Sequence, residues 1–342
     1  MSDTKDALQS SAARDSWVAR FATDADAEAI LDLLLAAYGS WPAHEIAVPA
    51  VEHLRWKLFG RDDVRAWQIV VEDAGRIIGL NAVFRQPISV RGQLRSAYQF
   101  VDLAVHPEHQ RRGVIPAARR FAVSARVPYG DVLFGPPRVK PGPAAQSTGR
   151  SDPALRRNAY LQALVLEGPV AAPPPARQSS WLLQTPSHFD ERIRAFSSDA
   201  AQPFDLISAH DKEFLNWRYC DRRAGRWTVH TAEEDARLLG YIAYRISGDS
   251  AYVGGLLALP DRLDVVESLL GEMMRSLQGQ GVPAVQCWTT SSHPYRAVLR
   301  DFGLDKKRRY VRLTVHADGE DLSDLEDRTA TLHITAADTD LV

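Results

Sequence analysis

Residues 100–120 read FVDLAVHPEHQRRGVIPAARR. A short apolar strand, Phe100 to Val105, runs into a polar turn, and the turn leads into a helix with Gly113 and Pro116 near its start. A helix start leaves about four backbone N–H groups without intrahelical partners and carries roughly half a positive charge. Glycine lets a ligand approach the backbone closely, and proline is tolerated in a first helical turn. The stretch therefore predicts a junction that binds an anion such as phosphate, with an ordinary strand-to-helix turn as the alternative.

The composition narrows the class of protein. A chain of 342 residues is longer than one core usually supports, so two domains are expected. The 41 basic and 43 acidic residues give a formal charge of -2, which argues against nucleic acid or an anionic membrane as the main partner. Two cysteines, Cys220 and Cys287, cannot form a disulfide framework or a multi-cysteine metal site, and each is expected to act as a small buried hydrophobe. No apolar stretch is long enough for a membrane span or a signal segment, and a cytoplasmic location is expected.

A duplicated pattern relates the two halves of the chain. The first half contains, in order, HLRWKL (53–58), WQIVV (67–71) and RIIGLNAVF (76–84). The second half contains FLNWRY (214–219), WTVH (227–230) and RLLGYIAYR (237–245). Trp56 and Gly79 are 23 positions apart, and so are Trp217 and Gly240. This shared order and spacing predicts two copies of one fold.

Hydrophobic periodicity extends both copies. The first copy is expected to contain a helix over 25–38, the strand ending at Val105, a helix after Gly113 and a strand over 131–134. For the second copy the pattern predicts strands over 238–246, 251–257, 284–289 and 310–315, with helices over 263–277 and 295–301. Alternating helices and strands predict an α/β fold with an open mixed sheet.

The spacing of Gln110 and Gly113 resembles the pyrophosphate loop of the GNAT acyltransferase superfamily, written Gln/Arg-x-x-Gly-x-Gly/Ala. The order of elements over residues 17–316 is also similar to the GNAT fold. The resemblance implies two tandem GNAT-like domains, each a mixed, mostly antiparallel sheet flanked by helices. It implies acetyl-CoA or another acyl-CoA as cofactor, with the loop around the diphosphate and the strand backbone along the pantetheine arm. The residues so implied are Leu103, Ala104, Val105, Gln110, Arg111, Arg112, Gly113, Val114 and Ile115. Ile115 departs from the family, which has Gly or Ala there.

The second copy differs at the same place. After its strand 251–257 it reads ALPDRLDVV, with Asp261 and Asp264 where the diphosphate would lie. Carboxylates there would repel phosphate. We therefore expect cofactor binding in the first copy only, with the second copy completing the acceptor site and burying apolar surface.

Two residues are candidates for proton transfer, which acyl transfer to an amine requires. Asp102, on the strand before the loop, is a candidate base, and a salt-bridged strand carboxylate is the alternative. Tyr160 lies four residues before Leu164, where the family has Tyr before Gly-Phe in a helix, and is a candidate acid for the departing thiolate. A tyrosine in the core or at the rim of an amphipathic helix is the alternative. Four other residues, secondary candidates in the loops, are Glu108, His109, His44 and Glu45.

The remaining segments complete the expected organisation. Residues 1–15 are expected to be a disordered lead-in, 16–170 the N-terminal domain, 171–200 a linker and 201–316 the C-terminal domain. The Pro-rich basic stretch 136–157 reads as a surface insertion or a lid. Residues 317–342 are acidic and are expected to form a solvated tail with one edge strand.

Together these features predict a cytoplasmic acyl-CoA-dependent N-acyltransferase. Its acceptor is expected to be an amine of a small molecule, and FLNWRY resembles tandem GNAT proteins in a way that favours an amino sugar or an amino-acid-like metabolite. No metal, nucleic acid or membrane is expected, and the sequence allows either a monomer or a homo-oligomer. The alternative is a catalytically silent tandem protein that binds a ligand or a partner.

Overall fold

The computed structural model describes residues 17–42, 44–61, 67–127, 129–136, 159–173 and 180–339. These residues fall into two compact units, which are described separately. Unit 1 holds the described residues up to Arg85 together with Gln99–Tyr129, and unit 2 holds Gln86–Tyr98 and the described residues from Gly130 onward.

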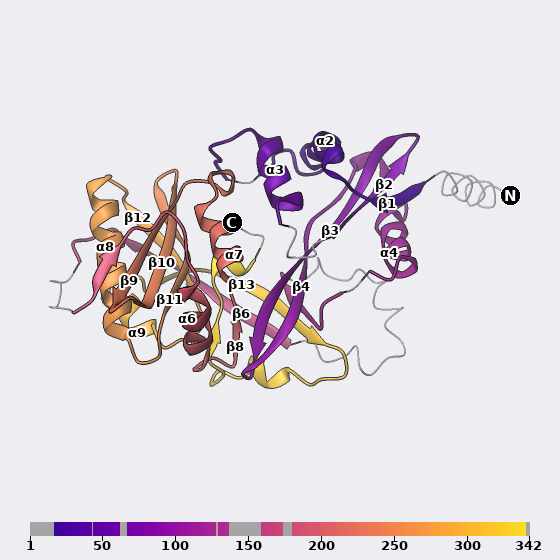
Figure 1. The fold of residues 1–342 in the computed structure, drawn as a ribbon. Coiled ribbons are helices and arrows are strands. Elements are labelled where there is room, and N and C mark those ends of the chain that lie inside the picture. Colours follow the sequence, from indigo (N-terminus) through magenta and orange to yellow (C-terminus); the bar gives the residue numbers. More distant parts are fainter. Residues whose placement is uncertain are drawn as a thin grey trace. The chain divides into compact units, whose positions relative to one another are not determined.

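Unit 1 contains the first copy of the repeat (Figure 1). Its strands are β1 (Val18–Phe21), β2 (Trp67–Asp73), β3 (Arg76–Val90) as far as Arg85, and β4 (Gln93–Val105) from Gln99 onward. Its helices are α2 (Ala27–Tyr38), α3 (Ala50–Phe59) and α4 (Val114–Ser124), with short 3₁₀ turns at Asp24–Asp26 and Pro107–His109. The strand order is β1-β2-β3-β4, with β1 and β3 both antiparallel to β2.

Unit 1 is held by a core beneath α2 and α3. Ile30 and Leu34 of α2 and Leu54 of α3 are fully buried, at the apolar spacing that the sequence shows, and they pack with Val70 and Leu80 of the sheet. Helix α4 packs against β1 and β2.

Unit 2 contains the second copy and the last strands of the first. Its strands are β5 (Val132–Gly135), β6 (Ala159–Pro169), β7 (Leu182–Gln184), β8 (Leu206–Ser208), β9 (Trp227–Glu234), β10 (Arg237–Ser247), β11 (Ser250–Ala258), β12 (Ala284–Thr289), β13 (Lys306–Ala317) and β14 (Leu332–His333). Its helices are α6 (Arg192–Ala201), α7 (Lys212–Leu215), a π-helical turn (Asn216–Cys220), α8 (Leu263–Gly279) and α9 (Arg296–Asp301), with 3₁₀ turns at Arg222–Ala224, Ser323–Glu326 and Ala336–Asp338.

Helices α6 and α8 cover opposite faces of the second-copy sheet. Gly240 of β10 faces α8, because a Cβ there would meet Val265, whereas the next residue, Tyr241, contacts Phe196 of α6. Consecutive strand residues point to opposite faces. The core on both sides is apolar, and α8 contributes seven buried side chains to it.

The last strands of the two copies are exchanged. In unit 2 the order runs β5-β13-β6-β12-β11-β10-β9-β7, so β13 of the second copy lies between β5 and β6 of the first. Strand β6 in turn lies between β13 and β12. The boundary between copies along the sequence is therefore not a boundary between sheets.

The predicted fold class is confirmed: helices flank a mixed, mostly antiparallel sheet, and the repeat recurs in the contacts. His106 N–H donates to Ile78 O at 2.9 Å, and Leu259 N–H donates to Leu239 O at 2.9 Å. These bonds align Val105 with Ala258 and Gly79 with Gly240. Gly79 also faces the start of α4, where a Cβ would meet Val114, as Gly240 faces α8.

Three expectations were wrong. The later part of the expected linker over 171–200 forms strand β7 and helix α6, and Ile193 and Phe196 of α6 lie in the core. The segment around Tyr160 is not a helix but strand β6, because Ala159, Leu161 and Ala163 are buried at a period of two and pair with β13. Nor is the C-terminal stretch a solvated tail. Leu322 and Leu325 lie in the core, β14 pairs with β8, and Asp338 is fully buried.

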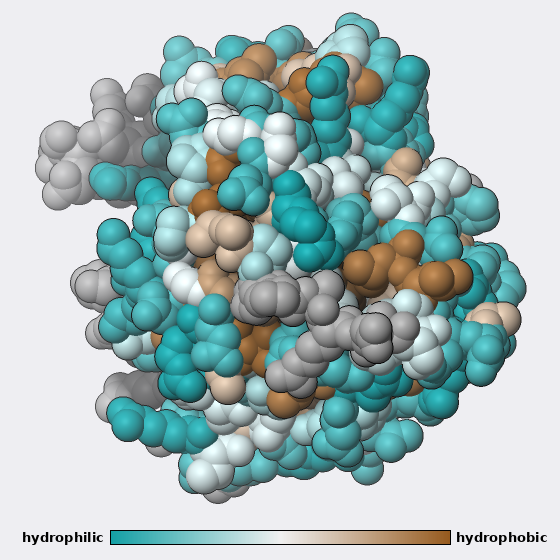
Figure 2. Space-filling model, turned by 90° about the vertical axis from the view of Figure 1, so that its left-hand side faces the viewer, coloured by the Kyte–Doolittle hydropathy of each residue, from teal (hydrophilic) through white to brown (hydrophobic). Residues whose placement is uncertain are grey.

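Several expectations fall outside the described residues. They concern the lead-in at 1–15, residues 137–157 of the basic Pro-rich stretch, and residues 174–179 of the linker. None of the helices described here has the length and apolar character needed to cross a membrane. In the view of Figure 2 the surface is mainly hydrophilic, with separate apolar patches.

Candidate functional site

The start of α4 is shaped for an anion. Gly113 is its N-cap with φ +94°, a conformation that strongly favours glycine, and Arg111 also has a positive φ of +61°. The N-cap has no side chain to cap the helix, and the first turn holds no acidic residue. The first intrahelical bond runs from Ala117 N–H to Gly113 O. The N–H groups of Val114 and Ile115 thus lie in the helix start, where a phosphate is favoured.

Two histidines hold the loop before α4. Arg76 donates to His106 Nε2 at 2.8 Å, and His109 Nε2 lies 3.3 Å from Asp73 Oδ2. Both partners sit on the β2–β3 hairpin. His106, Glu108 and His109 also have the spacing of three metal ligands. The Arg76 donor puts the His106 proton on Nδ1, however, and Nδ1 is the nitrogen that would have to bind an ion. We therefore assign the cluster to holding the loop.

Strand β4 bulges at Asp102. Val101 and Ala104 are three positions apart yet both lie in the core under α2 and α3, so one extra residue is accommodated between them. Asp102 has φ +45°, which is uncommon for a residue other than glycine. Tyr38, at the end of α2, donates its hydroxyl to Leu103 O at 2.8 Å. The bulge therefore turns the Leu103 carbonyl toward α2.

Asp102 belongs to an ion pair. Lys57 Nζ of α3 lies 2.8 Å from Asp102 Oδ2, and the two side chains are only 10% and 7% exposed. Trp41 donates its indole N–H to Asp102 Oδ1 at 2.8 Å. The ammonium also lies 5.4 Å from the centre of a Trp41 ring, within cation–π range. The structure therefore shows this carboxylate in a salt bridge.

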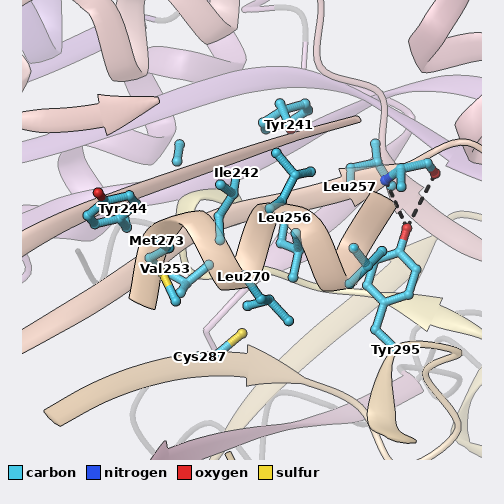
Figure 3. Close-up of a cluster of buried hydrophobic side chains, with 14 of the residues drawn as sticks. Tyr241, Ile242, Tyr244, Val253, Leu256, Leu257, Leu270, Met273, Cys287 and Tyr295 are labelled. Carbon is cyan, nitrogen blue, oxygen red and sulfur yellow. Dashed lines mark hydrogen bonds between the residues drawn. The ribbon is translucent and has the colours of Figure 1, made fainter. Parts of the chain in front are cut away.

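The equivalent helix start in the second copy carries an acidic side chain. Asp264 lies in the first turn of α8, and the Arg262 N-cap pairs with it at 3.0 Å. The hydroxyl of Tyr295, the N-cap of α9, accepts from the Ala258 N–H of β11 at 2.9 Å and donates to Ala258 O at 3.3 Å, as Figure 3 shows. Ala258 is the equivalent of Val105. The second copy therefore differs from the first at both places, with a carboxylate at the helix start and a side-chain hydroxyl bonded to the strand backbone at Ala258.

The structure places the other predicted residues as follows. Leu103 and Val105 are half-buried, Ala104 is buried in the core, and Val114 packs beneath Gly79. Three residues of the loop are exposed: Gln110, Arg111 and Arg112. These residues and Asp102 all belong to unit 1.

Tyr160 belongs to unit 2, where it is 54% exposed. Its backbone N–H donates to Glu326 Oε1 at 2.8 Å. The family has its tyrosine in a helix, whereas Tyr160 lies in strand β6, so the two positions are not equivalent.

Both cysteines fit the expectation of unreactive thiols. Cys287 is buried, and burial raises the pKa of its thiol to about 12. Burial also raises the pKa of the Cys220 thiol. A thiol kept protonated is a poor nucleophile.

Sequence reasoning missed Tyr38, Trp41 and Lys57. The available signal was weak: Lys57 follows Trp56 in the repeat, where the second copy has Arg218 after Trp217. A cation at the same position in both copies marks a position whose charge is used. Which carboxylate it meets depends on the bulge in β4, and no local pattern shows that bulge.

Comparison with known proteins agrees with this geometry. The family model described as "Acetyltransferase (GNAT) domain" matches residues 18–118. This span contains the strand, the loop and the start of α4. The chain carries a GNAT domain. None of the curated proteins compared with it has a significantly similar sequence.

Solved structures extend the likeness beyond the GNAT domain. A probable N-acyltransferase from Enterococcus faecalis has 12% identity and a TM-score of 0.62, covering 91% of this chain and 74% of its own. A tandem GNAT protein from the clavulanic acid biosynthesis pathway has 19% identity and a TM-score of 0.56, covering 89% and 99%. The N-myristoyltransferase of Saccharomyces cerevisiae with bound myristoyl-CoA has 10% identity and a TM-score of 0.57, covering 93% and 90%. These likenesses show the fold, and the second supports the tandem arrangement.

Proposed function

We propose that the chain is an acyl-CoA-dependent N-acyltransferase whose cofactor binds in the first copy. The observation that carries the proposal is the contrast between two equivalent helix starts. The start of α4 has glycine as its N-cap and no acid in its first turn, whereas α8 has Arg262 as its N-cap and the carboxylate of Asp264 in its first turn. The N–H groups of Val114 and Ile115 would hold the diphosphate, and the loop arginines Arg111 and Arg112 would add positive charge.

The acyl end of the cofactor would lie along β4 by resemblance to the family. The backbone of β4 at Leu103 and Val105 would face the pantetheine arm of the cofactor. We propose acetyl-CoA or another acyl-CoA as donor, and a small-molecule amine, such as an amino sugar or an amino-acid-like metabolite, as acceptor. We also propose a cytoplasmic location, consistent with the two free cysteines among the described residues.

Asp102 remains our candidate for accepting the proton of the acceptor amine. Its Oδ1 already accepts from Trp41 and its Oδ2 is ion-paired with Lys57, but an ionised carboxylate has about four acceptor sites, so capacity is left. For the departing thiolate we propose Tyr38 in place of Tyr160, because its half-exposed hydroxyl lies 2.8 Å from Leu103 O. In this scheme Asp102 would take the proton of the amine as its nitrogen attacks the thioester carbonyl, and Tyr38 would supply its phenolic proton to the sulfur that leaves when the C–S bond breaks.

Calorimetric titration with acetyl-CoA tests the cofactor claim. We expect binding to the parent protein and markedly weaker binding to Gly113→Ala. The matched control is Gly75→Ala, since both glycines have positive φ, +94° and +80°, and open space where a Cβ would stand. Equal affinity in the two variants, or no binding to the parent, would overturn the claim and favour a silent binding protein.

Thiol release tests the roles of the two side chains. Asp102→Asn and Tyr38→Phe should each lower kcat by about 10²-fold or more while leaving acetyl-CoA binding intact. Unchanged turnover in both variants would remove the proposed proton transfers and leave the cofactor claim standing.

A further inference from the structure

The FLNWRY motif contributes to a cluster of buried polar and aromatic side chains in unit 2, separate from the cofactor loop of unit 1. Arg218 and Tyr219 of the motif lie on the π-helical turn, and both are buried, at 7% and 3% exposed. They pack around Trp227 at the start of β9. The Tyr219 ring meets the indole edge-on at 5.0 Å, and the Arg218 guanidinium lies 6.0 Å from a ring of it.

A second arginine approaches the same indole. Arg245 of β10 pairs across the sheet with Trp227, and its guanidinium lies 5.1 Å from a ring of the indole. Arg245 is only 6% exposed. Burial, together with the charge of Arg218, lowers the pKa of Arg245 to about 10, and only Tyr252 acts in the opposite direction, with no Asp or Glu among the causes. A buried cation without a counter-charge is costly unless something supplies one.

The donors of this cluster lack acceptors. Among the residues that the structure describes, none accepts a hydrogen bond from Arg245 Nε, Trp227 Nε1 or the Tyr219 hydroxyl, and all three atoms are buried. Burial also holds the pKa of Tyr219 well above its ordinary value, so its hydroxyl keeps its proton. Buried polar groups are nearly always hydrogen-bonded. Three unsatisfied donors in one cluster call for an acceptor from outside the described chain.

Gly225 leaves room for that acceptor. Its φ of +117° and ψ of -174° fall in a region that is essentially restricted to glycine. The position that a Cβ would take lies 3.9 Å from Trp227 Nε1 and 4.0 Å from Arg245 Nη1, and no other described atom beyond the chain neighbours is within 4 Å. An indole N–H and a guanidinium thus converge on one open point.

The first copy shows what fits such a pair of donors. There an indole N–H, from Trp41, and a cation, Lys57, both bind the carboxylate of Asp102 at 2.8 Å. The cation lies over the indole in both places, at 5.4 Å for Lys57 and 5.1 Å for Arg245. The alignment of the copies places Gly255 where the first copy has Asp102, so the second copy has the donors without the carboxylate.

We propose that Arg245 and Trp227, beside Gly225, bind the carboxylate of a small molecule. This site does not depend on the cofactor proposal, because it is built entirely from unit 2. A ligand carboxylate there would accept from the indole N–H and the guanidinium, as the side chain of Asp102 accepts from Trp41 and Lys57.

Calorimetry with matched pairs of small molecules tests this site. The probes are succinate against succinamide and glutarate against glutaramide, at constant ionic strength, with inorganic phosphate as a third arm. We expect the dicarboxylates to bind and the amides not to bind. Arg245→Met should weaken binding about tenfold or more, because a hydrogen bond to a charged group is lost, and Trp227→Phe should weaken it less. Arg237→Gln, an exposed position on the same strand, should have no effect.

Thermal unfolding without ligand provides an independent measurement. Arg245→Met should not lower the Tm, since it removes a buried charge for which no described residue is the partner. Gly113→Ala should keep the carboxylate response, which separates this site from the cofactor loop. The proposal is overturned if the amides bind as well as the acids, if phosphate alone binds, or if Arg245→Met and Trp227→Phe both retain full affinity.

Discussion

The ion pair between Lys57 and Asp102 gives the sharpest stability prediction. Lys57→Met removes the ammonium and leaves a carboxylate that is 7% exposed and keeps only the Trp41 N–H among the partners given above. Removing one partner of a buried ion pair costs ~3–5 kcal/mol. Because 10% of the Lys57 side chain still reaches solvent, we expect the lower end, about 3 kcal/mol.

The second member of the pair allows a double-mutant cycle. Asp102 has φ +45°, and glycine at that position would relieve about 1 kcal/mol of left-handed strain. The double variant Lys57→Met, Asp102→Gly therefore loses both charges and gains a suitable backbone. We expect it to be more stable than the sum of the single changes predicts, with a coupling of about 2 kcal/mol.

Urea unfolding followed by tryptophan fluorescence measures the cycle. Arg237→Gln breaks an exposed ion pair with Asp199 and should change the free energy of unfolding by less than about 0.5 kcal/mol. A loss below about 1 kcal/mol in Lys57→Met, or single effects that add within about 0.5 kcal/mol, would refute the reasoning.

Three further predictions follow from the packing and the buried histidines. Gly79→Ala should lower stability by ~1–3 kcal/mol, because its Cβ would lie 2.2 Å from Val114 Cγ1, and adding Val114→Ala should restore part of the Tm; a full loss that persists in the double variant contradicts this. Tyr295→Phe should cost ~1–3 kcal/mol in urea unfolding, because Ala258 N–H loses its buried acceptor; no measurable loss would argue against the hydrogen bond. Burial lowers the pKa of His333 to about 4, below its ordinary value near 6.5, so the unfolded chain binds the proton more readily and stability should fall as the pH drops from about 6.5 to about 4. His333→Gln should flatten that slope, and an unchanged slope would assign it to other groups.

Much of the fold could be predicted from the sequence because its signals are local. The helix over 263–277 and the strands over 238–246 and 284–289 have strong apolar periodicity, and the structure confirms each within a few residues. The repeat added a second, independent signal through Gly79 and Gly240, which prove to face the same helix start in each copy.

The expectations that were wrong concern segments whose structure depends on residues far away in the sequence. Residues 159–165 have a pattern that fits a helix or a strand, and the outcome depends on β12 and β13, more than 100 residues later. The acidic composition after Ala317 predicted a solvated tail, but a few apolar residues such as Leu322 and Leu325 reach the core.

The candidate site also has one part that local sequence predicts and one part that depends on distant residues. The helix start at Gly113 could be read from consecutive residues, because one segment supplies the turn, the glycine and the N–H groups. The contacts of Asp102 could not be predicted from consecutive residues. Trp41 and Lys57 come from segments about 60 and 45 residues earlier, and they meet Asp102 because β4 bulges there.

The exchange of β6 and β13 bears on how this gene can change. Once each half of a duplication completes the hydrogen-bonding of the other, neither can be deleted or expressed by itself without leaving two strand edges open. Selection would then keep the later half for its backbone, whatever the chemistry at its own helix start. Its side chains, released from the original chemistry, would be free to acquire a different ligand.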